Sequence, residues 1–205
     1  MSDRRVDWDY VHRSNFENAA FSELQWIRKA KSLYEAAKKL EAEVVSIWEN
    51  RQAHAKDVSV RLTADHYQGP YFMLIAFAVE NLLKAAAVAS SREKYRSQFR
   101  RSKRFPKELK KHDLVKLAEL VALSFNAEDE DLLRRLTRSA VWYGRYPIPL
   151  NYAKMSGDEQ FTDGNEYLVS WFGEDDIHRL NKFVLNLPKR LGLVQRYWSS
   201  ASDKG

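Results

Sequence analysis

The stretch that decides the fold is WIRKAKSLYEAAKKLEAEVVSI, residues 26–47. Its apolar positions are Trp26, Ala30, Leu33, Ala37, Leu40, Val44 and Ile47. Their spacing alternates between four and three residues over three heptads, which is typical of a helix packed along the seam of a bundle. Phe16, Ala20 and Leu24 continue the pattern toward the N-terminus. The sequence therefore begins with a long bundle helix.

Four more helices are expected along the chain. They cover Tyr71 to about Ala89, a stretch opened by His112-Asp113-Leu114, a stretch from the N-cap candidate Asn126 to Ala140, and Ile177 to Trp198. The first of these is apolar nearly all round and should lie at the centre of the bundle. The third is amphipathic, with Arg134, Arg135 and Arg138 on faces other than the leucine face. Pro188 should kink the last helix.

The sequence thus predicts an all-α fold, an up-and-down bundle of about five helices. These helices should form one domain over residues 1–198, and residues 199–205 should be a disordered tail. The range 150–172 is rich in turn formers, so we expect an irregular or short β-containing insertion there. Tyr167–Phe172 is its candidate strand.

Composition excludes several classes of function. The chain of 205 residues has no cysteine, which rules out disulfides, cysteine-ligated metals and thiol catalysis. No motif with the spacing of a metal site stands out in the sequence, so we expect neither a metal nor a cofactor. The N-terminus is polar, and the longest apolar run, Tyr71–Val79, is well short of the ~20 residues of a membrane span. The sequence predicts a cytoplasmic protein that does not enter a membrane.

Positive charge is concentrated in one segment, residues 92–111. The whole chain carries a net charge of +6, but this segment alone holds ten Lys or Arg residues against two Glu. Interleaved with Tyr95, Phe99 and Phe105, these cations resemble a phosphate-tracking strip with stacking aromatics. The alternative is a solvated loop or helix that the aromatic rings merely anchor. The candidate nucleic-acid contacts are Arg100, Arg101, Lys103, Arg104, Lys107, Lys110 and Lys111.

A second candidate site is WYGRYPIP, residues 142–149. Gly144 can adopt a positive φ and Pro147 bars continuation, so Arg145 should lie just beyond a helix end. There its guanidinium is well placed for a phosphate or carboxylate. Alternatively, Arg145 bonds the last helical carbonyls and stacks on Trp142 or Tyr146. Tyr143 and Tyr146 could likewise stack on bases or form a packed corner.

Polar side chains on the central helix and after the basic segment could support such a site. Glu80 and Lys84 are spaced as an i,i+4 ion pair, at the core edge or lining a polar pocket. A buried carboxylate needs a partner, and Arg145 is a candidate for Glu80. His112 could act in catalysis, or it could pack locally where it or Asp113 caps the next helix.

Three pieces of the chain together are similar to a known family. They are AVENLLKA at residues 78–85, the helix start His112-Asp113-Leu114-x-x-Leu117, and the helix that ends near Arg145. In this order they resemble HEPN-like domains (higher eukaryotes and prokaryotes nucleotide-binding). The resemblance covers roughly residues 72–149 by motif and the remainder only by helical pattern.

The resemblance implies an up-and-down helical bundle, usually a homodimer, that works on RNA or associates with nucleotidyltransferases. Active members are metal-independent RNases with an arginine followed four to six residues later by a histidine. Arg145 matches the arginine, but Asn151 stands six residues on, and asparagine cannot act as the general base.

We therefore expect a HEPN-like, homodimeric protein that binds RNA or another polyanion through the basic segment and Arg145, without catalysis. One alternative is a non-catalytic interaction module, the partner of a nucleotidyltransferase or of a defence system. Another is a divergent metal-independent RNase in which His112 replaces the missing base.

Overall fold

The structure is a computed structural model that describes residues 7–145, 158–160, 166–168, 172–193 and 198. Its α-helices are α1 (Trp8–Ala20), α2 (Glu23–Lys56), α3 (Gln68–Ser102), α4 (Leu114–Leu120), α5 (Ala127–Arg138) and α6 (Glu174–Arg190). A 3₁₀ turn, η1 (Glu108–Lys110), precedes α4, and a π-helical turn, η2 (Ser139–Tyr143), follows α5. The predicted all-α bundle is confirmed.

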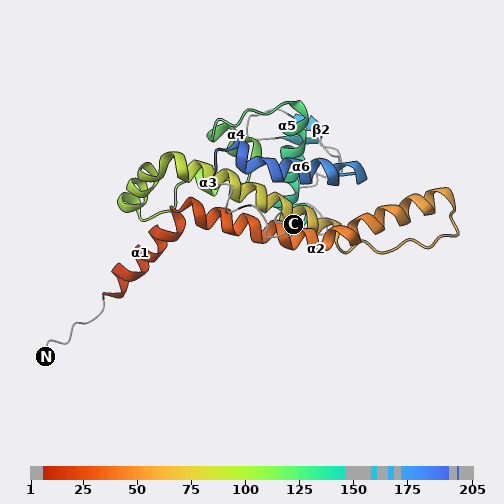
Figure 1. The fold of residues 1–205 in the computed structure, drawn as a ribbon, viewed down its shortest axis with the longest axis horizontal. Helices are drawn as coiled ribbons and strands as arrows, with labels where there is room; N and C mark the ends of the chain where they lie inside the picture. Colours follow the sequence, from red (N-terminus) through yellow and green to blue (C-terminus); the bar gives the residue numbers. More distant parts are fainter. Residues whose placement is uncertain (1–6, 146–157, 161–165, 169–171, 194–197, 199–205) are drawn as a thin grey trace, which may run out of the picture.

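The molecule is elongated, and α3 is its central helix (Figure 1). The long helix α2 lies along one side of α3, and α4 and α5 lie along the other. α6 packs on α3 and also contacts α2, where Asn181 bonds to Tyr34 and Glu41. At one end α1 projects from the body, and at the other the last turns of α2 project together with the chain that returns to α3. α3 is long and apolar enough to cross a membrane, but 72% of its most apolar stretch is buried inside the protein.

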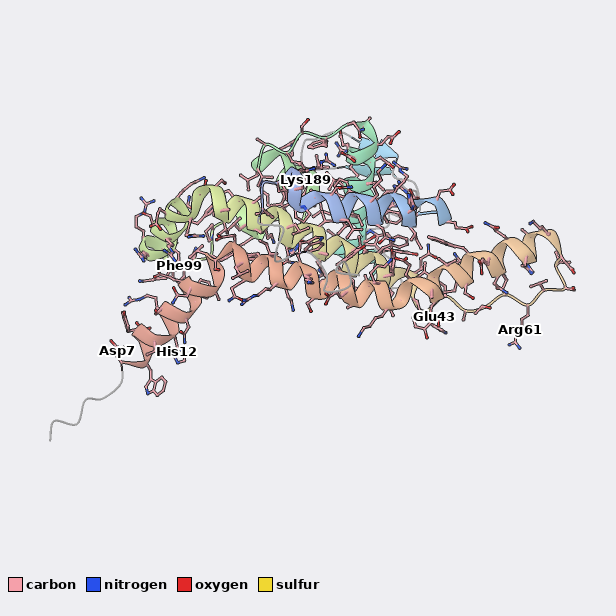
Figure 2. All side chains as sticks on the ribbon, viewed as in Figure 1. Asp7, His12, Glu43, Arg61, Phe99 and Lys189 are labelled. Atoms are coloured by element: carbon pink, nitrogen blue, oxygen red, sulfur yellow. The ribbon has the colours of Figure 1, made fainter. Side chains whose placement is uncertain are left out.

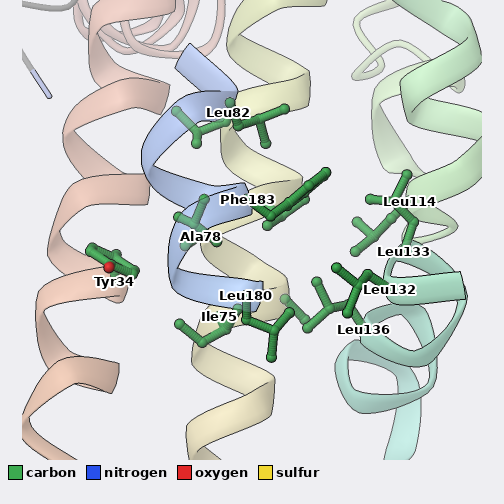
Figure 3. Close-up of a cluster of buried hydrophobic side chains, with 14 of the residues drawn as sticks. Tyr34, Ile75, Ala78, Leu82, Leu114, Leu132, Leu133, Leu136, Leu180 and Phe183 are labelled. Atoms are coloured by element: carbon green, nitrogen blue, oxygen red, sulfur yellow. The ribbon is translucent and has the colours of Figure 1, made fainter. Parts of the chain in front are cut away.

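The main hydrophobic core forms where α3 meets α5 and α6 (Figure 3). Ile75, Ala78 and Leu82 of α3 are fully buried and face Leu180 and Phe183 of α6. The other layer of this core consists of Leu114, Leu132, Leu133 and Leu136, from α4 and α5. Burial of such side chains stabilises the fold by about 1.5–3 kcal/mol each.

A second, smaller core lies where α1, α2 and the end of α3 meet. Phe16 of α1 stacks on Phe99 of α3, with 4.7 Å between ring centroids. The prediction of one continuous helix through Phe16 and Leu24 is wrong, because the chain turns at Phe21 to bury that ring completely. The Trp26 indole then donates to a carbonyl at the end of α1, which fixes the corner.

α3 is longer than the sequence predicted. Instead of ending near Ala89 it continues through a kink at Ser91, where φ is −138° and ψ is 33°. The kink falls at the Ser90-Ser91 pair, a common cause of helix bending. The helix closes at Lys103, whose φ of 55° is left-handed, so the first half of the basic segment is helical.

α6 is shorter than predicted. It ends at Arg190 rather than at Trp198, with Pro188 in its last turn. Gly192 follows with a φ of 64°, the left-handed conformation in which helices commonly close. The sequence pattern could not indicate this end, because apolar residues continue beyond it at helical spacing.

Two three-residue strands pair antiparallel between α5 and α6. Asp158–Gln160 forms β1 and Glu166–Leu168 forms β2, with Asp158 opposite Leu168. The candidate strand Tyr167–Phe172 overlaps β2 in two residues. Most of the range 146–171 lies outside the described residues, so the insertion stays a prediction, as does the tail at 199–205.

Candidate nucleic-acid interface

The ten cations of residues 92–111 fall into two groups. Four of them make ion pairs: Arg92 with Glu23, Lys94 with Glu108, Arg96 with Glu93, and Arg100 with Glu17. The last pair fastens α1 to α3, because the Glu17 carboxylate is buried and lies 2.8 Å from the Arg100 guanidinium. Arg100 therefore has an architectural role in addition to any contact with a ligand.

The other six cations are exposed and, within the part of the chain that the structure describes, make no ion pair. We call them the tip cations: Arg101, Lys103, Arg104, Lys107, Lys110 and Lys111. They occupy the last turn of α3, which lies near Phe99 in Figure 2, the loop after it, η1 and the residue that follows η1. Lys111, the last of them, adjoins His112, which contacts Glu80. Unlike the four paired cations, they keep their full charge available to a ligand.

The aromatic residues of the basic segment point into the protein. Tyr95 and Phe99 are only 1% and 8% exposed. Phe105 is half-buried, and its ring contacts Phe21 and Trp26 at centroid distances of 6.4 and 6.2 Å. Burial, with a smaller contribution from the nearby Glu108, raises the pKa of the Tyr95 hydroxyl. The rings therefore anchor the segment, as in the alternative interpretation, and offer no stacking platform.

Two hollows flank the end of α3. Hollow A, of about 490 Å³, lies between α1 and α3. Its charged lining consists of Arg13, Arg96, Arg100, Lys103 and Glu17. Hollow B, of about 730 Å³, lies between α3 and the loop that follows it. Its charged lining consists of Arg101, Arg104, Lys107, Lys110 and Glu108. Each hollow thus has four cations and one acid, and in hollow A two of the cations, Arg96 and Arg100, are ion-paired.

Glu80 lies at the centre of a separate polar cluster. The predicted pair is confirmed, with Lys84 Nζ 2.6 Å from one Glu80 oxygen, and His112 Nδ1 lies 2.9 Å from the other. Glu80 and Lys84 are 5% and 4% exposed, whereas the His112 side chain is half exposed. The sequence had suggested Arg145 as the partner of Glu80, and that prediction is wrong. Asp113, not His112, caps α4 by accepting from Lys116 N–H at 3.1 Å.

Arg145 lies at the end of η2 and is exposed. Its guanidinium carbon is 5.0 Å from the centre of the Phe77 ring on α3, so it stacks there rather than on Trp142. Its N–H donates to the Trp142 carbonyl at 2.9 Å, and among the described residues it has no ion-pair partner. Tyr146 and Asn151 lie outside the described residues. π-helical turns such as η2 are frequent at functional sites.

Gly144 is required for a different reason than predicted. Its φ is −85°, so no left-handed conformation is needed. A Cβ atom there would instead lie 2.3 Å from Met73 Cβ, because η2 packs directly on α3. Tyr143 is partly buried beside it, and burial, followed by the charge of Asp65, raises the pKa of its hydroxyl. This favours the packed-corner interpretation of Tyr143.

The two candidate sites are separate. Arg145 stacks on Phe77, and His112 contacts Glu80. Phe77 and Glu80 are three residues apart on α3, so they lie within one turn on the same face of the helix. Arg101 is 24 residues further along this helix, which corresponds to about 36 Å. Arg145 and Arg101 therefore cannot contact the same phosphate, whereas the tip cation Lys111 adjoins His112 and so lies near Glu80.

Sequence reasoning missed a buried charge network on α5. Arg134, Arg135 and Arg138 are at most 5% exposed, so the faces of α5 beside the leucine face are buried as well. Arg135 binds both oxygens of Asp176 at 2.6 and 3.0 Å. Burial opposes ionisation of Asp176, but hydrogen bonds from Arg135 and from Gly173 N–H outweigh it and lower its pKa. Glu130 and Asp131 of α5 also pair with Arg134 and Arg135, at 2.5 and 2.7 Å. Leucine spacing gives no sign of the partner Asp176, which comes from α6.

Comparison of the chain with protein-family models, with curated proteins and with solved structures found no significant match. The resemblance to HEPN-like domains therefore stays a prediction. Among the described residues, no group of three His, Asp or Glu side chains is arranged to hold a metal ion.

Proposed function

We propose that this protein binds RNA or another phosphate polyanion through the tip cations, without catalysis. The observation that supports this is the contrast within one segment: the tip cations lack ion-pair partners among the described residues, while their neighbours are paired. Exposed Lys and Arg side chains gain affinity for a polyanion mainly by releasing its condensed counterions. Clustering at one end of the molecule lets a single polyanion contact several of them.

The experiment compares two variants that lose the same charge. The tip variant replaces four cations: Arg101→Gln, Arg104→Gln, Lys107→Gln and Lys110→Gln. The control variant replaces four exposed cations of α2: Arg28→Gln, Lys29→Gln, Lys39→Gln and Lys56→Gln. Binding of a fluorescein-labelled 24-nucleotide RNA is followed by anisotropy at about 100 mM salt. We expect the tip variant to bind at least ~100-fold more weakly, on the order of a few kcal/mol. Equal losses in both variants would show only non-specific attraction.

Arg145 is proposed as a second phosphate contact. It is exposed, fixed on Phe77 and without an ion-pair partner among the described residues. Because the rise along α3 from Phe77 to Arg101 is about 36 Å, a polyanion that contacts both Arg145 and the last turn of α3 must span that distance. Arg145→Gln should therefore weaken binding of a 24-nucleotide RNA more than binding of an 8-nucleotide RNA.

Cleavage is the second candidate function, and the contact of His112 with Glu80 favours it. A carboxylate on Nδ1 orients an imidazole and leaves Nε2 free to accept a proton. A denaturing gel of end-labelled RNA, with excess chelator, separates the two functions. Cleavage lost in both His112→Ala and Arg145→Ala would establish a metal-independent RNase; intact RNA supports binding alone.

The proposed homodimer and the interaction-module alternative concern other surfaces. At the projecting turn between α2 and α3, Val58 and Leu62 are 83% and 52% exposed and offer apolar surface to a second copy. Light scattering of the wild type and of Val58→Asp/Leu62→Asp tests whether this turn holds two copies together. A dimer that persists in the variant must use another surface.

A further inference from the structure

The geometry at the end of α3 points to a double-stranded ligand: we propose that the tip binds the two phosphate rows of a nucleic-acid duplex, one row in each hollow. This inference rests on the proposed function and specifies its substrate class. The common chemistry is a pair of parallel phosphate rows, which duplex RNA and duplex DNA both present.

The first support is that the two hollows lie on opposite faces of one helix. Hollow A is lined by Arg96 and Arg100 of α3, and hollow B by Gln98 and Arg101. At 3.6 residues per turn, Gln98 is about 200° round the helix from Arg96. α3 therefore ends as a ridge with one basic hollow on each side.

The second support is the width of this ridge. An α-helix with its side chains is about 10–12 Å across, which matches the ~12 Å major groove of B-form DNA. Duplex RNA likewise has a wide, shallow minor groove that protein side chains can enter. Lys103, which closes α3 in the left-handed conformation, lies at the end of the ridge and lines hollow A. A ridge in a groove brings its flanking cations to the phosphates on either side.

The third support is the lack of surfaces for unpaired bases. Proteins that bind single strands gain about 1–3 kcal/mol per base from aromatic stacking. In hollow B the lining ring, Phe105, is turned toward Phe21 and Trp26. In hollow A the lining ring, Tyr10, has the Arg13 guanidinium 5.9 Å above its centroid. The tip can thus contact a backbone but cannot hold a run of splayed bases.

The test measures three probes of equal length: a 20-base-pair RNA duplex, a 20-base-pair DNA duplex and unstructured 20-nucleotide oligouridine. We expect a duplex to bind at least tenfold more tightly than oligouridine at about 100 mM salt. Equal affinity for both duplexes identifies the shared backbone as the ligand, and preference for one identifies the source. Oligouridine binding as tightly as the better duplex would overturn the inference but leave the proposed function intact. Failure of all three probes to bind would overturn both.

Two paired variants test the use of both hollows. Arg13→Gln/Lys103→Gln removes two cations of hollow A, and Arg104→Gln/Lys107→Gln removes two of hollow B. For the duplex, each pair should reduce the slope of log K against log salt by about 2. We expect oligouridine to occupy only one hollow at a time, so one of the two paired variants should leave its slope of log K against log salt unchanged. Lys29→Gln/Lys39→Gln, two exposed cations of α2, is the control and should leave the slope for the duplex unchanged. Equal loss of duplex and oligouridine in both paired variants would refute a two-row site.

Discussion

The buried pair of Glu80 and Lys84 allows a quantitative prediction about stability. Both side chains are at most 7% exposed, and Lys84 also lies 5.9 Å from the centre of the Trp26 ring. Removing one partner of a buried ion pair leaves an uncompensated charge, at a cost of about 3–5 kcal/mol. Glu80→Leu should show the full cost, because Lys84 loses its carboxylate. Lys84→Met should fall at the lower end, since His112 still contacts Glu80.

The double variant Glu80→Leu/Lys84→Met separates pairing from packing. It buries no charge and conserves apolar volume, so we expect it to be more stable than either single variant, within about 1–2 kcal/mol of the wild type. Urea unfolding followed by far-ultraviolet circular dichroism gives the four free energies of the cycle, provided that the m-values agree. If each single variant lowers the free energy of unfolding by under about 1 kcal/mol, and the two losses add in the double variant, the pair is not buried as described.

Three further changes follow from the same contacts. The pKa of Asp176 is lowered, so its carboxylate should stabilise the protein fully above its usual pKa of 3.8 and lose that contribution as the pH falls below it. The difference in unfolding free energy between wild type and Asp176→Asn should therefore shrink from about pH 5 to about pH 2.5. A constant difference would contradict the ion pair with Arg135. Gly144→Ala should cost about 1–3 kcal/mol in urea unfolding, because the new methyl group overlaps Met73 Cβ, and Met73→Ala should not restore the loss because alanine keeps that Cβ atom. Asp113→Ala should cost about 1 kcal/mol by removing the cap of α4, and Asp113→Asn should retain most of the stability.

Local sequence patterns predicted those helices well whose position is set by one continuous apolar face. The seam from Trp26 to Ile47 indicated α2, and the apolar run after Tyr71 indicated a central helix. Asn126 was correctly predicted as a cap, since it accepts from Asp129 N–H at 2.9 Å. Such features depend on residues within one or two turns, which a sequence displays directly.

Features set by distant contacts were not predictable. The break at Phe21 depends on a hydrophobic cluster that α3 completes, and the reach of α3 beyond Ala89 depends on Tyr95 and Phe99 packing into that same cluster. The second partner of Glu80, besides Lys84, is His112, 32 residues away on another segment. Spacing on a single helix carries no information about such neighbours.

The candidate interface was only partly predictable. Charge counting located the basic segment, and it could not tell which cations are neutralised by acids on α1 and α2, such as Glu17 and Glu23. Nor could it place the aromatic rings, which alternate with cations in the sequence but point inward in the structure. The distinction between a stacking strip and a backbone-binding ridge arises only from the fold.

The salt dependence of polyanion binding tests the central claim most directly. A 20-base-pair RNA duplex is titrated with the wild type and with the four-residue tip variant between about 50 and 200 mM salt. With six tip cations engaged, the slope of log K against log salt should be about −5 for the wild type, and four fewer cations should bring it to about −2. A slope that is the same in both proteins, or no binding at 50 mM salt, would contradict the account.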